Sequence, residues 1–270
     1  MTAALTSILD VADTYDAIVF DQFGVLHDGT SAYPNAIRAL DALTQTTCQL
    51  AVLTNSGKRS DLNRTRITSM GFHAETFAQV MTSGEAVWRD LKSKGAHTKL
   101  FPITAAAKDA PTWAGDLNLT FCANVAEADA VLLMGLPDNG DHAHAHAALD
   151  DALARNLPVL CSNPDRAAPR ADGKTVISPG TLAHAYQDKG GIVTFYGKPH
   201  PPVFTALQTA LGVTDPKKIL MVGDSPEHDI AGAHAAGWAS LFISGGLHAG
   251  SNEDLFTTIA PPTYQQEILT

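Results

Sequence analysis

Cysteine is scarce in this chain, which has only Cys48, Cys122 and Cys161 among its 270 residues. The three lie far apart in the sequence, and none belongs to a Cys-x-x-Cys pair. A disulfide framework and a cysteine-based zinc site are therefore disfavoured, because both need paired or clustered cysteines. We expect a protein of a reducing compartment, the cytoplasm.

Positive charge is also in short supply. The chain has 18 Lys and Arg residues against 28 Asp and Glu residues, a formal net charge of -10. Such a charge repels nucleic acid and anionic membranes unless a basic patch overrides it. The densest basic group, Lys58, Arg59, Arg64 and Arg66, is typical of the polar face of one helix. We expect no nucleic-acid or membrane partner.

Long apolar runs are missing as well. None reaches the roughly 18 residues that a membrane-spanning helix needs. The first residues, MTAALTSILDVADTYD, contain acids where a secretion signal has bases. These two absences predict a soluble protein that is not exported.

The residues that are present describe a globular α/β protein. Hydrophobic residues make up 45% of the chain and charged residues 17%, which is too apolar for a disordered chain. Short β-branched runs alternate with Ala-rich stretches of helical period, as in parallel sheets with crossover helices. The expected central strands are residues 17–20, 49–53, 192–195, 219–222 and 240–243.

The long interval between the second and third of these strands has an alternation of its own, with short apolar runs at 99–103, 130–134 and 158–161. We interpret it as an inserted α/β domain of residues 82–181, with residues 1–81 and 182–270 forming the core domain. Thr82-Ser83-Gly84-Glu85 is typical of a helix start, and Ser178-Pro179-Gly180 is typical of a linker.

Polar residues follow the ends of the expected core strands. Asp21, Thr54, Lys198 and Asp224 all stand at such ends. Because ligands of open parallel sheets bind at the carboxyl edge of the strands, these side chains are candidates for one common site.

Four short segments carry these residues: IVFDQFGVLHDG around Asp21, LTNS around Thr54, GKP around Lys198, and VGDS at Asp224, which continues to Asp229. As an ordered set they resemble the four motifs of the haloacid dehalogenase (HAD) superfamily. The resemblance spans nearly the whole chain and implies a Rossmann-like parallel-sheet core. Because the insert lies between the second and third motifs, it also implies a class IIA cap domain, as in 4-nitrophenylphosphatase and nucleotide phosphatase relatives.

The resemblance implies a hydrolase that acts on a small phosphorylated metabolite. Asp21 would attack phosphorus and form an aspartyl-phosphate, which divides one difficult displacement into two easier ones. Lys198 would neutralise the phosphoryl charge, and Thr54, Asn55 and Ser56 would hold its oxygens. Taken singly, Asp21 or Thr54 could be a helix cap and Lys198 a surface residue, so the assignment depends on the whole set.

Carboxylates in the first and fourth segments also predict a metal site. Oxygen ligands suit Mg²⁺, which keeps several waters and uses few protein carboxylates. Asp21, Asp224 and the backbone carbonyl of Phe23 are the expected ligands. Asp229 would orient the site or bind the ion through water, unless it is only a first-turn acid of the following helix.

Phe23 departs from the family pattern. Family phosphatases carry there a second Asp that acts as general acid and then as general base, assistance worth about 10² to 10⁴ in rate. The phosphatase is therefore expected to be impaired or atypical. Either His27, Asp28 or a cap residue replaces the acid, or the aspartyl-phosphate is long-lived, or the substrate is not a phosphate ester. The alternatives are a non-catalytic protein that binds a phosphorylated ligand and, less favoured, a dehalogenase, since dehalogenases have an aromatic residue there but lack the Mg²⁺ acids.

The predicted insert holds two further groups of candidate residues. Asn163, Asp165, Arg166 and Arg170 either face the substrate or only close a loop of the cap. The alternating histidines His142, His144 and His146 cannot share one face of a helix, so structural or solvated roles are expected for them.

Overall fold

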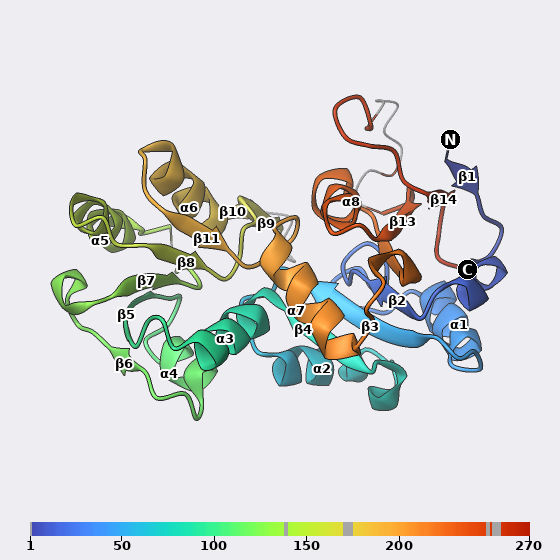
Figure 1. The fold of residues 1–270 in the computed structure, drawn as a ribbon, viewed down its shortest axis with the longest axis horizontal. Helices are drawn as coiled ribbons and strands as arrows, with labels where there is room; N and C mark the ends of the chain where they lie inside the picture. Colours follow the sequence, from blue (N-terminus) through green and yellow to red (C-terminus); the bar gives the residue numbers. More distant parts are fainter. Residues whose placement is uncertain (1, 138–139, 170–174, 247–248, 250–254) are drawn as a thin grey trace. The chain divides into compact units, whose positions relative to one another are not determined.

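The computed structural model describes residues 2–137, 140–169, 175–246, 249 and 255–270 (Figure 1). Backbone contacts divide the chain into two compact units. We call them the core unit, of Met1–Thr54, Ser60–Met81 and Lys198–Thr270, and the insert unit, of Asn55–Arg59 and Thr82–Gly197. The insert unit therefore includes the last two residues of the second motif, Asn55 and Ser56, and the three residues that follow them.

The core unit is built on a seven-stranded sheet with the order β1-β14-β13-β12-β2-β3-β4. Its central strands pair in parallel, and all four residues of β2 are buried, as expected where helices cover both faces of a parallel sheet. The strands are β1 (Ala3–Ala4), β2 (Ala17–Phe20), β3 (Gln49–Thr54), β4 (Gln79–Thr82), β12 (Ile219–Gly223), β13 (Ala239–Ile243) and β14 (Tyr264–Gln266).

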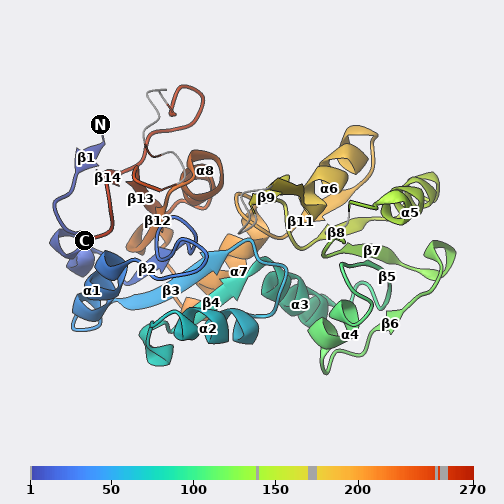
Figure 2. The same ribbon diagram turned by 180° about the vertical axis from the view of Figure 1, so that it is seen from behind.

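Helices cover this sheet. Helix α1 (Pro34–Leu43) buries Ala36, Ala39, Leu40 and Leu43, spaced three and four residues apart, in one cluster with Ile18 and Phe20 of β2. Helix α7 (Pro201–Leu211) lies in front of the strands in Figure 1 and behind them in Figure 2. The remaining helices are α2 (Ser60–Ser69) and α8 (Ala231–Ala235), with short helical turns η1 (Ile8–Asp10), η2 (Ala12–Thr14), η3 (Ala74–Thr76), η5 (Pro216–Lys218) and η6 (Pro226–Ile230).

The insert unit has a parallel five-stranded sheet with the order β11-β8-β7-β5-β6 and a separate hairpin of β9 and β10. Helices α5 and α6 lie on one side of this sheet, and α3 and α4 lie on the other (Figures 1 and 2). The elements are α3 (Ser83–Lys94), β5 (Lys99–Ile103), α4 (Asp109–Ala114), β6 (Thr120–Phe121), η4 (Val125–Glu127), β7 (Ala130–Leu133), α5 (Ala143–Ala154), β8 (Val159–Cys161), β9 (Ala167–Pro169), β10 (Thr175–Ile177), α6 (Pro179–Asp188) and β11 (Val193–Phe195).

One predicted core strand belongs to the other sheet. We expected residues 192–195 in the core and the second domain boundary near Thr181. Instead β11 pairs with β8, Val193 opposite Val159, and the insert unit ends at Gly197. The reason is that α6 packs onto the insert sheet, where Leu182 and Tyr186 share a buried cluster with Phe195. The longer segment of the insert unit begins at Thr82, and Asn55–Arg59 joins it from outside the predicted range.

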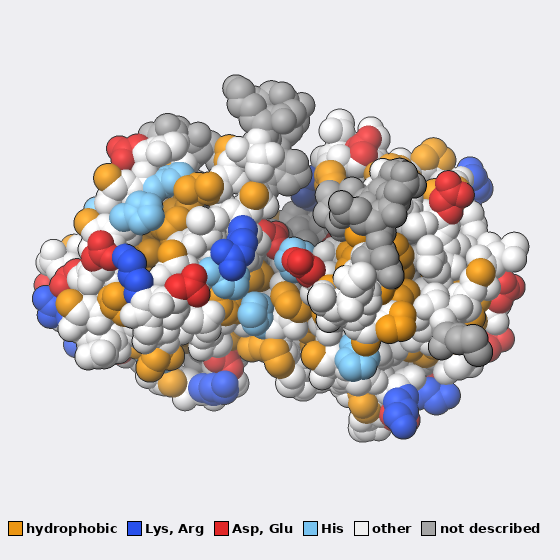
Figure 3. Space-filling view, turned by 90° about the horizontal axis from the view of Figure 1, so that it is seen from above, with side chains coloured by type: hydrophobic (Ala, Val, Ile, Leu, Met, Phe, Trp, Pro, Cys, Tyr) orange, Lys and Arg blue, Asp and Glu red, His pale blue; other side chains and the backbone are white. Residues whose placement is uncertain are grey.

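The basic group does not form one helix face. Helix α2 begins at Ser60, so Lys58 and Arg59 precede it and belong to the insert unit. Within the core unit, Arg64 donates to the carbonyls of Ala74 and Phe77, and Arg66 donates to that of Gly29. Lys and Arg are dispersed among acids on the face that Figure 3 shows. No helix in the described part of the chain is long and apolar enough to cross a membrane.

Candidate active site

Neighbouring core strands bring the predicted residues together. Asp21 directly follows β2, and its N–H donates to the carbonyl of Val222 in the adjacent strand β12 at 2.9 Å. Asp224 directly follows β12, and Asp229 lies in the turn η6 that comes next. The shared carboxyl edge of β2 and β12 therefore holds three carboxylates from two motifs, as expected for parallel neighbours.

Lys198 joins two of these carboxylates. Its Nζ lies 2.7 Å from Oδ1 of Asp21 and 2.7 Å from Oδ1 of Asp229. The side chains of Lys198 and Asp229 are 3% and 0% exposed, whereas that of Asp21 keeps 16% of its surface. Asp21 is therefore the member of this triad that a ligand from solvent can reach.

Burial and charge oppose each other in this triad. Burial alone would lower the pKa of Lys198, but the carboxylates of Asp21 and Asp229 outweigh it and hold that pKa above its usual value. Burial raises the pKa of Asp21, and the Lys198 ammonium opposes that rise. Lys198 therefore stays a cation, and its charge stabilises the carboxylates buried beside it.

Asp21, Asp224 and Asp229 each offer an oxygen, and these oxygens lie within 4.8 Å of one another. Three carboxylates against the single ammonium of Lys198 leave two negative charges, which suits a divalent cation. Both oxygens of Asp229 already accept bonds, Oδ1 from Lys198 and Oδ2 from the Ser225 N–H at 3.0 Å. The donor set therefore fits Mg²⁺, with Asp229 placed to orient the site.

Two glycines make room for Asp224, and sequence reasoning missed both. A Cβ on Gly24 would lie 1.8 Å from Oδ2 of Asp224, and one on Gly246 would lie 2.4 Å from the same oxygen. Gly24 also has φ +80°, a conformation that favours glycine. Gly24 directly follows Phe23 in the first motif, but only the three-dimensional approach to Asp224 explains why it must be glycine.

Phe23 lies with its side chain 42% exposed. Its ring meets the imidazole of His27 edge to face, with 6.5 Å between the ring centroids. His27 itself is 1% exposed, its Nδ1 accepts the Gly29 N–H at 3.0 Å, and its Nε2 has no hydrogen-bond partner in the described part of the chain. Burial, with the charge of Arg66, lowers the pKa of His27.

Asp28, the other proposed replacement for the missing acid, is tied into a turn. Its Oδ1 accepts the N–H groups of Thr30 at 2.8 Å and Ser31 at 2.7 Å. These bonds lower the pKa of the Asp28 carboxyl. Asp28 is therefore held as a carboxylate and is a weak proton donor.

The second motif is divided between the units. Thr54 ends β3 in the core unit, whereas Asn55 and Ser56 belong to the insert unit. There the Asn55 side chain donates to Oδ1 of Asp165 at 2.7 Å, and the Ser56 carbonyl accepts the Gly84 N–H at 3.1 Å. The roles predicted for Asn55 and Ser56 in phosphate binding stay predictions.

The candidate loop of the insert unit is ordered around Asp165, whose N–H donates to the Asn163 side chain at 3.0 Å. Arg166 is exposed, and Arg170 lies outside the described residues. The histidine run behaves as expected: α5 begins at Ala143, with His142 at its N-cap.

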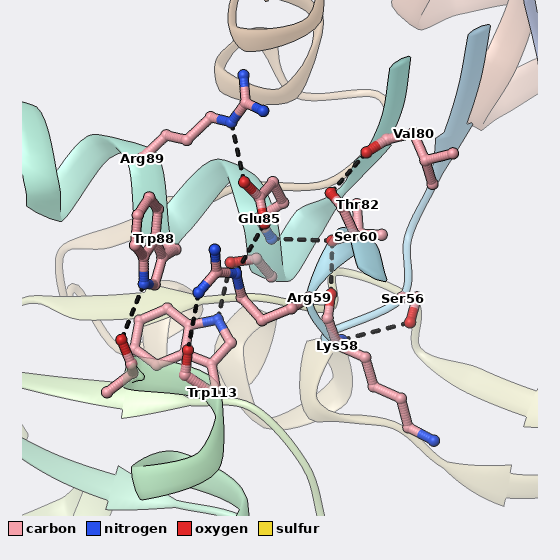
Figure 4. Close-up of polar contacts among 12 residues, drawn as sticks. Ser56, Lys58, Arg59, Ser60, Val80, Thr82, Glu85, Trp88, Arg89 and Trp113 are labelled. Carbon is pink, nitrogen blue, oxygen red and sulfur yellow. Dashed lines mark hydrogen bonds and ion pairs between the residues drawn. The ribbon is translucent and has the colours of Figure 1, made fainter. Parts of the chain in front are cut away.

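An ion-pair cluster around the buried Glu85, which we call the Glu85 cluster (Arg59, Glu85, Trp88 and Arg89), joins Arg59 to helix α3 within the insert unit (Figure 4). Glu85 accepts from Arg59 at 2.7 Å and from Arg89 at 3.0 Å, and the Arg59 guanidinium lies 3.9 Å from the Trp88 ring centroid. Burial alone would raise the pKa of Glu85, but its bonds to the two arginines lower it. Sequence reasoning recognised the helix start at Thr82 but missed this cluster.

Comparison with known proteins gives two family matches, one that runs from the core unit into the insert unit and one near the end of the chain. A model described as haloacid dehalogenase-like hydrolase matches residues 18–110, and a second, HAD-hydrolase-like model matches residues 195–268. Human chronophin is 25% identical over 252 residues, which cover 89% of this chain and 85% of chronophin.

Solved structures agree with the fold. A haloacid dehalogenase-like hydrolase from Brucella suis 1330 matches with 28% identity and a TM-score of 0.81, over 98% of this chain and 99% of that chain. A 4-nitrophenylphosphatase from Thermotoga maritima matches with 18% identity and a TM-score of 0.77, over 96% of each chain. A glycerol phosphate phosphatase from Mycobacterium tuberculosis, in complex with calcium, matches with 23% identity and a TM-score of 0.71, over 88% of this chain and 68% of that chain. The α/β fold prediction is confirmed.

Proposed function

The chain belongs to the haloacid dehalogenase-like hydrolases, as its four motifs predicted, and on that premise we propose that it is a Mg²⁺-dependent phosphatase working through an aspartyl-phosphate on Asp21. The proposed activity is of the phosphatase type, which the names of several similar proteins describe. The substrate we propose is a small phosphorylated metabolite of the cytoplasm.

The observation that carries the proposal is the Lys198 bridge. Lys198 stands 2.7 Å from both Asp21 and Asp229, beside the carboxylate of Asp224. A phosphoryl group that reaches the exposed edge of Asp21 meets the ammonium of Lys198, which offsets the repulsion between the carboxylate and the phosphate oxygens. Such positioning and charge neutralisation dominate phosphoryl transfer.

The residues of the site divide the tasks of the proposed reaction. Asp21 attacks phosphorus, Lys198 and Thr54 hold the phosphoryl oxygens, and Asp229 fixes Lys198. Asp21, Asp224 and the Phe23 carbonyl would hold Mg²⁺, which supplies further neutralisation of phosphoryl charge when bound. The insert unit would be the cap domain that selects the substrate, and phosphate binding is the role proposed for Asn55 and Ser56.

The test is hydrolysis of 4-nitrophenyl phosphate with and without Mg²⁺, for the wild type and Asp21→Asn. We expect turnover only for the wild type with Mg²⁺, because an amide is a poor nucleophile and the carboxylates repel phosphate without the cation. Equal turnover by the two proteins would exclude the covalent mechanism.

Phe23 keeps a second candidate in view, a non-catalytic protein that binds a phosphorylated ligand. This alternative predicts tight binding of a phosphorylated metabolite by calorimetry, with no phosphate release over hours. A dehalogenase ranks lower because Asp224 and Asp229, which Mg²⁺-independent dehalogenases lack, lie beside Asp21 here. It would release halide from a 2-haloacid in the presence of a chelator.

A further inference from the structure

The aromatic side chain two residues after Asp21 is presented to solvent on a rigid support. Phe23 is 42% exposed and is one of the large apolar side chains that the described part of the chain leaves open to solvent. The edge-to-face contact with His27 braces one side of the ring, and a Cβ at Gly29 would lie only 3.3 Å from its Cε2. The ring is therefore a fixed apolar surface beside the nucleophile rather than part of the core.

The groups around this ring are poor proton donors. His27 is 1% exposed, its ring meets that of Phe23 edge to face, and its Nδ1 already accepts the Gly29 N–H. Asp28 is occupied by the Thr30 and Ser31 N–H groups. The ammonium of Lys198 is engaged by the carboxylates of Asp21 and Asp229, each at 2.7 Å.

Tyr33 is another ionisable side chain of this region, and the charges of Asp28 and Asp224 act on its phenol. It lines a cavity of about 210 Å³ together with Gly24, Pro34 and Ile268. Burial raises the pKa of its phenol, so it holds its proton more firmly than an ordinary tyrosine. In the described part of the core unit, an apolar ring thus occupies the place where a leaving group would need an acid.

We propose that Phe23 restricts this enzyme to phosphates whose leaving group departs without a proton, namely aryl, enol and acyl phosphates, and that its ring is the surface which that leaving group contacts. The proposal rests on the phosphatase function proposed above and names its substrate class. A planar, unsaturated leaving group is also the kind that packs well against an aromatic ring.

The chemistry balances without a protein acid. An oxygen of Asp21 bonds to phosphorus, the bond from phosphorus to the leaving oxygen breaks, and its electron pair departs as an aryloxide, enolate or carboxylate. That anion takes a proton from solvent afterwards. Water then attacks the aspartyl-phosphate at phosphorus, the bond to Asp21 breaks, and both protons of the water leave on phosphate as dihydrogen phosphate. An alkoxide leaves far more slowly in this way, because no acid protonates it as it departs.

The first experiment needs only the wild type. We would measure kcat/KM with Mg²⁺ for substituted phenyl phosphates of increasing phenol pKa, for acetyl phosphate, and for glycerol phosphate as the alkyl ester. The expected result is a steep fall with leaving-group pKa, and glycerol phosphate slower than 4-nitrophenyl phosphate by at least about 10²-fold, the lower bound for lost acid catalysis. A shallow dependence, or equal rates for the alkyl and aryl esters, would overturn the proposal and show that an acid is supplied elsewhere.

Two variants test the missing acid and the ring contact separately. Phe23→Asp should raise the rate on glycerol phosphate relative to 4-nitrophenyl phosphate by about 10² to 10⁴-fold, the range of general acid catalysis. Phe23→Leu, the matched control without an acid or a ring, should keep the steep dependence and raise KM for aryl phosphates relative to acetyl phosphate. An unchanged KM ratio in Phe23→Leu would overturn the contact with the leaving group. Failure of the underlying function looks different, since no phosphate of any class would then be hydrolysed.

Discussion

The ammonium group of Lys198 lies 2.7 Å from Oδ1 of Asp229, a carboxylate that is 0% exposed. Asp229 is thus satisfied entirely inside the protein, by Lys198 through one oxygen and by the Ser225 N–H through the other. The buried pair therefore joins the third and fourth motifs and stabilises the fold there. Because Lys198 also contacts Asp21, the same pair holds a cation beside the proposed nucleophile.

Replacing Lys198 by methionine should therefore cost both stability and activity. The change leaves Asp21 and Asp229 buried without their cation, and removing one partner of a buried pair typically costs about 3–5 kcal/mol. We expect urea unfolding to move to lower urea concentration by a corresponding amount. The double variant Lys198→Met with Asp229→Asn should recover part of the stability but no activity. Recovery of activity in the double variant would contradict the assigned role of Lys198.

The two glycines that make room for Asp224, Gly24 and Gly246, predict that larger residues at these positions weaken metal binding. Gly24→Ala and Gly246→Ala place a Cβ where Oδ2 of Asp224 now lies, so the carboxylate must move. We expect the Mg²⁺ concentration for half-maximal activity to rise about tenfold or more, as for losses of support around metal ligands. The control is Gly190→Ala, which shares a positive φ but has open space around it. An equal Mg²⁺ requirement in all three variants would show that Mg²⁺ binding does not need the space at Gly24 and Gly246.

Mg²⁺ should also stabilise the folded protein. A ligand that binds only the native state adds about 2.7 kcal/mol at a concentration of 100 times its Kd. At about 2–4 °C per kcal/mol for a chain of this size, the melting temperature should rise by roughly 5–10 °C at that concentration. Asp224→Asn should lose most of this rise because one carboxylate ligand is gone, whereas Asp151→Asn, at an exposed pair with Arg155, should keep it.

The Glu85 cluster predicts a pH dependence of stability. The bonds from Arg59 and Arg89 hold the pKa of Glu85 below its ordinary value of 4.5, so the contribution of the carboxylate is present above that value and is lost as the pH falls below it. Unfolding measured between pH 6 and pH 3 should therefore show a smaller loss of stability in Glu85→Gln than in the wild type. Asp151→Asn is again the matched control, since its pair with Arg155 is exposed. Identical pH profiles for the wild type and Glu85→Gln would contradict this reasoning.

Much of the site was predictable because strand ends mark it. Asp21, Lys198, Asp224 and Asp229 stand in short motifs beside apolar runs, and parallel strands bring such ends to one edge. The role of Gly246 was not predictable, because only the folded chain brings it close to Asp224. The bond between Asn55 and Asp165 likewise joins residues 110 positions apart.

The boundary of the insert shows a different limit. Val193–Phe195 is a short apolar strand whose residues suit either parallel sheet equally well. Its place beside β8 is decided by α6, which buries Leu182 and Tyr186 against the insert sheet. Pattern alone identifies such a strand, but the packing of the preceding helix decides which sheet it joins.

The missing carboxylate at Phe23 predicts that the second chemical step limits turnover. With a good leaving group the first step needs no acid, whereas water must attack the aspartyl-phosphate without a general base, assistance worth about 10² to 10⁴ in rate. Rapid mixing with 4-nitrophenyl phosphate and Mg²⁺ should therefore give a burst of 4-nitrophenol, equal to the enzyme concentration, before a slower steady state.

Acid quenching during that steady state should trap phosphate on the protein, and Asp21→Asn should show neither signal. Phe23→Asp should shorten or abolish the burst because it supplies the base. Linear release of 4-nitrophenol by the wild type, with no phosphorylated protein, would mean that a group outside the core unit activates the water.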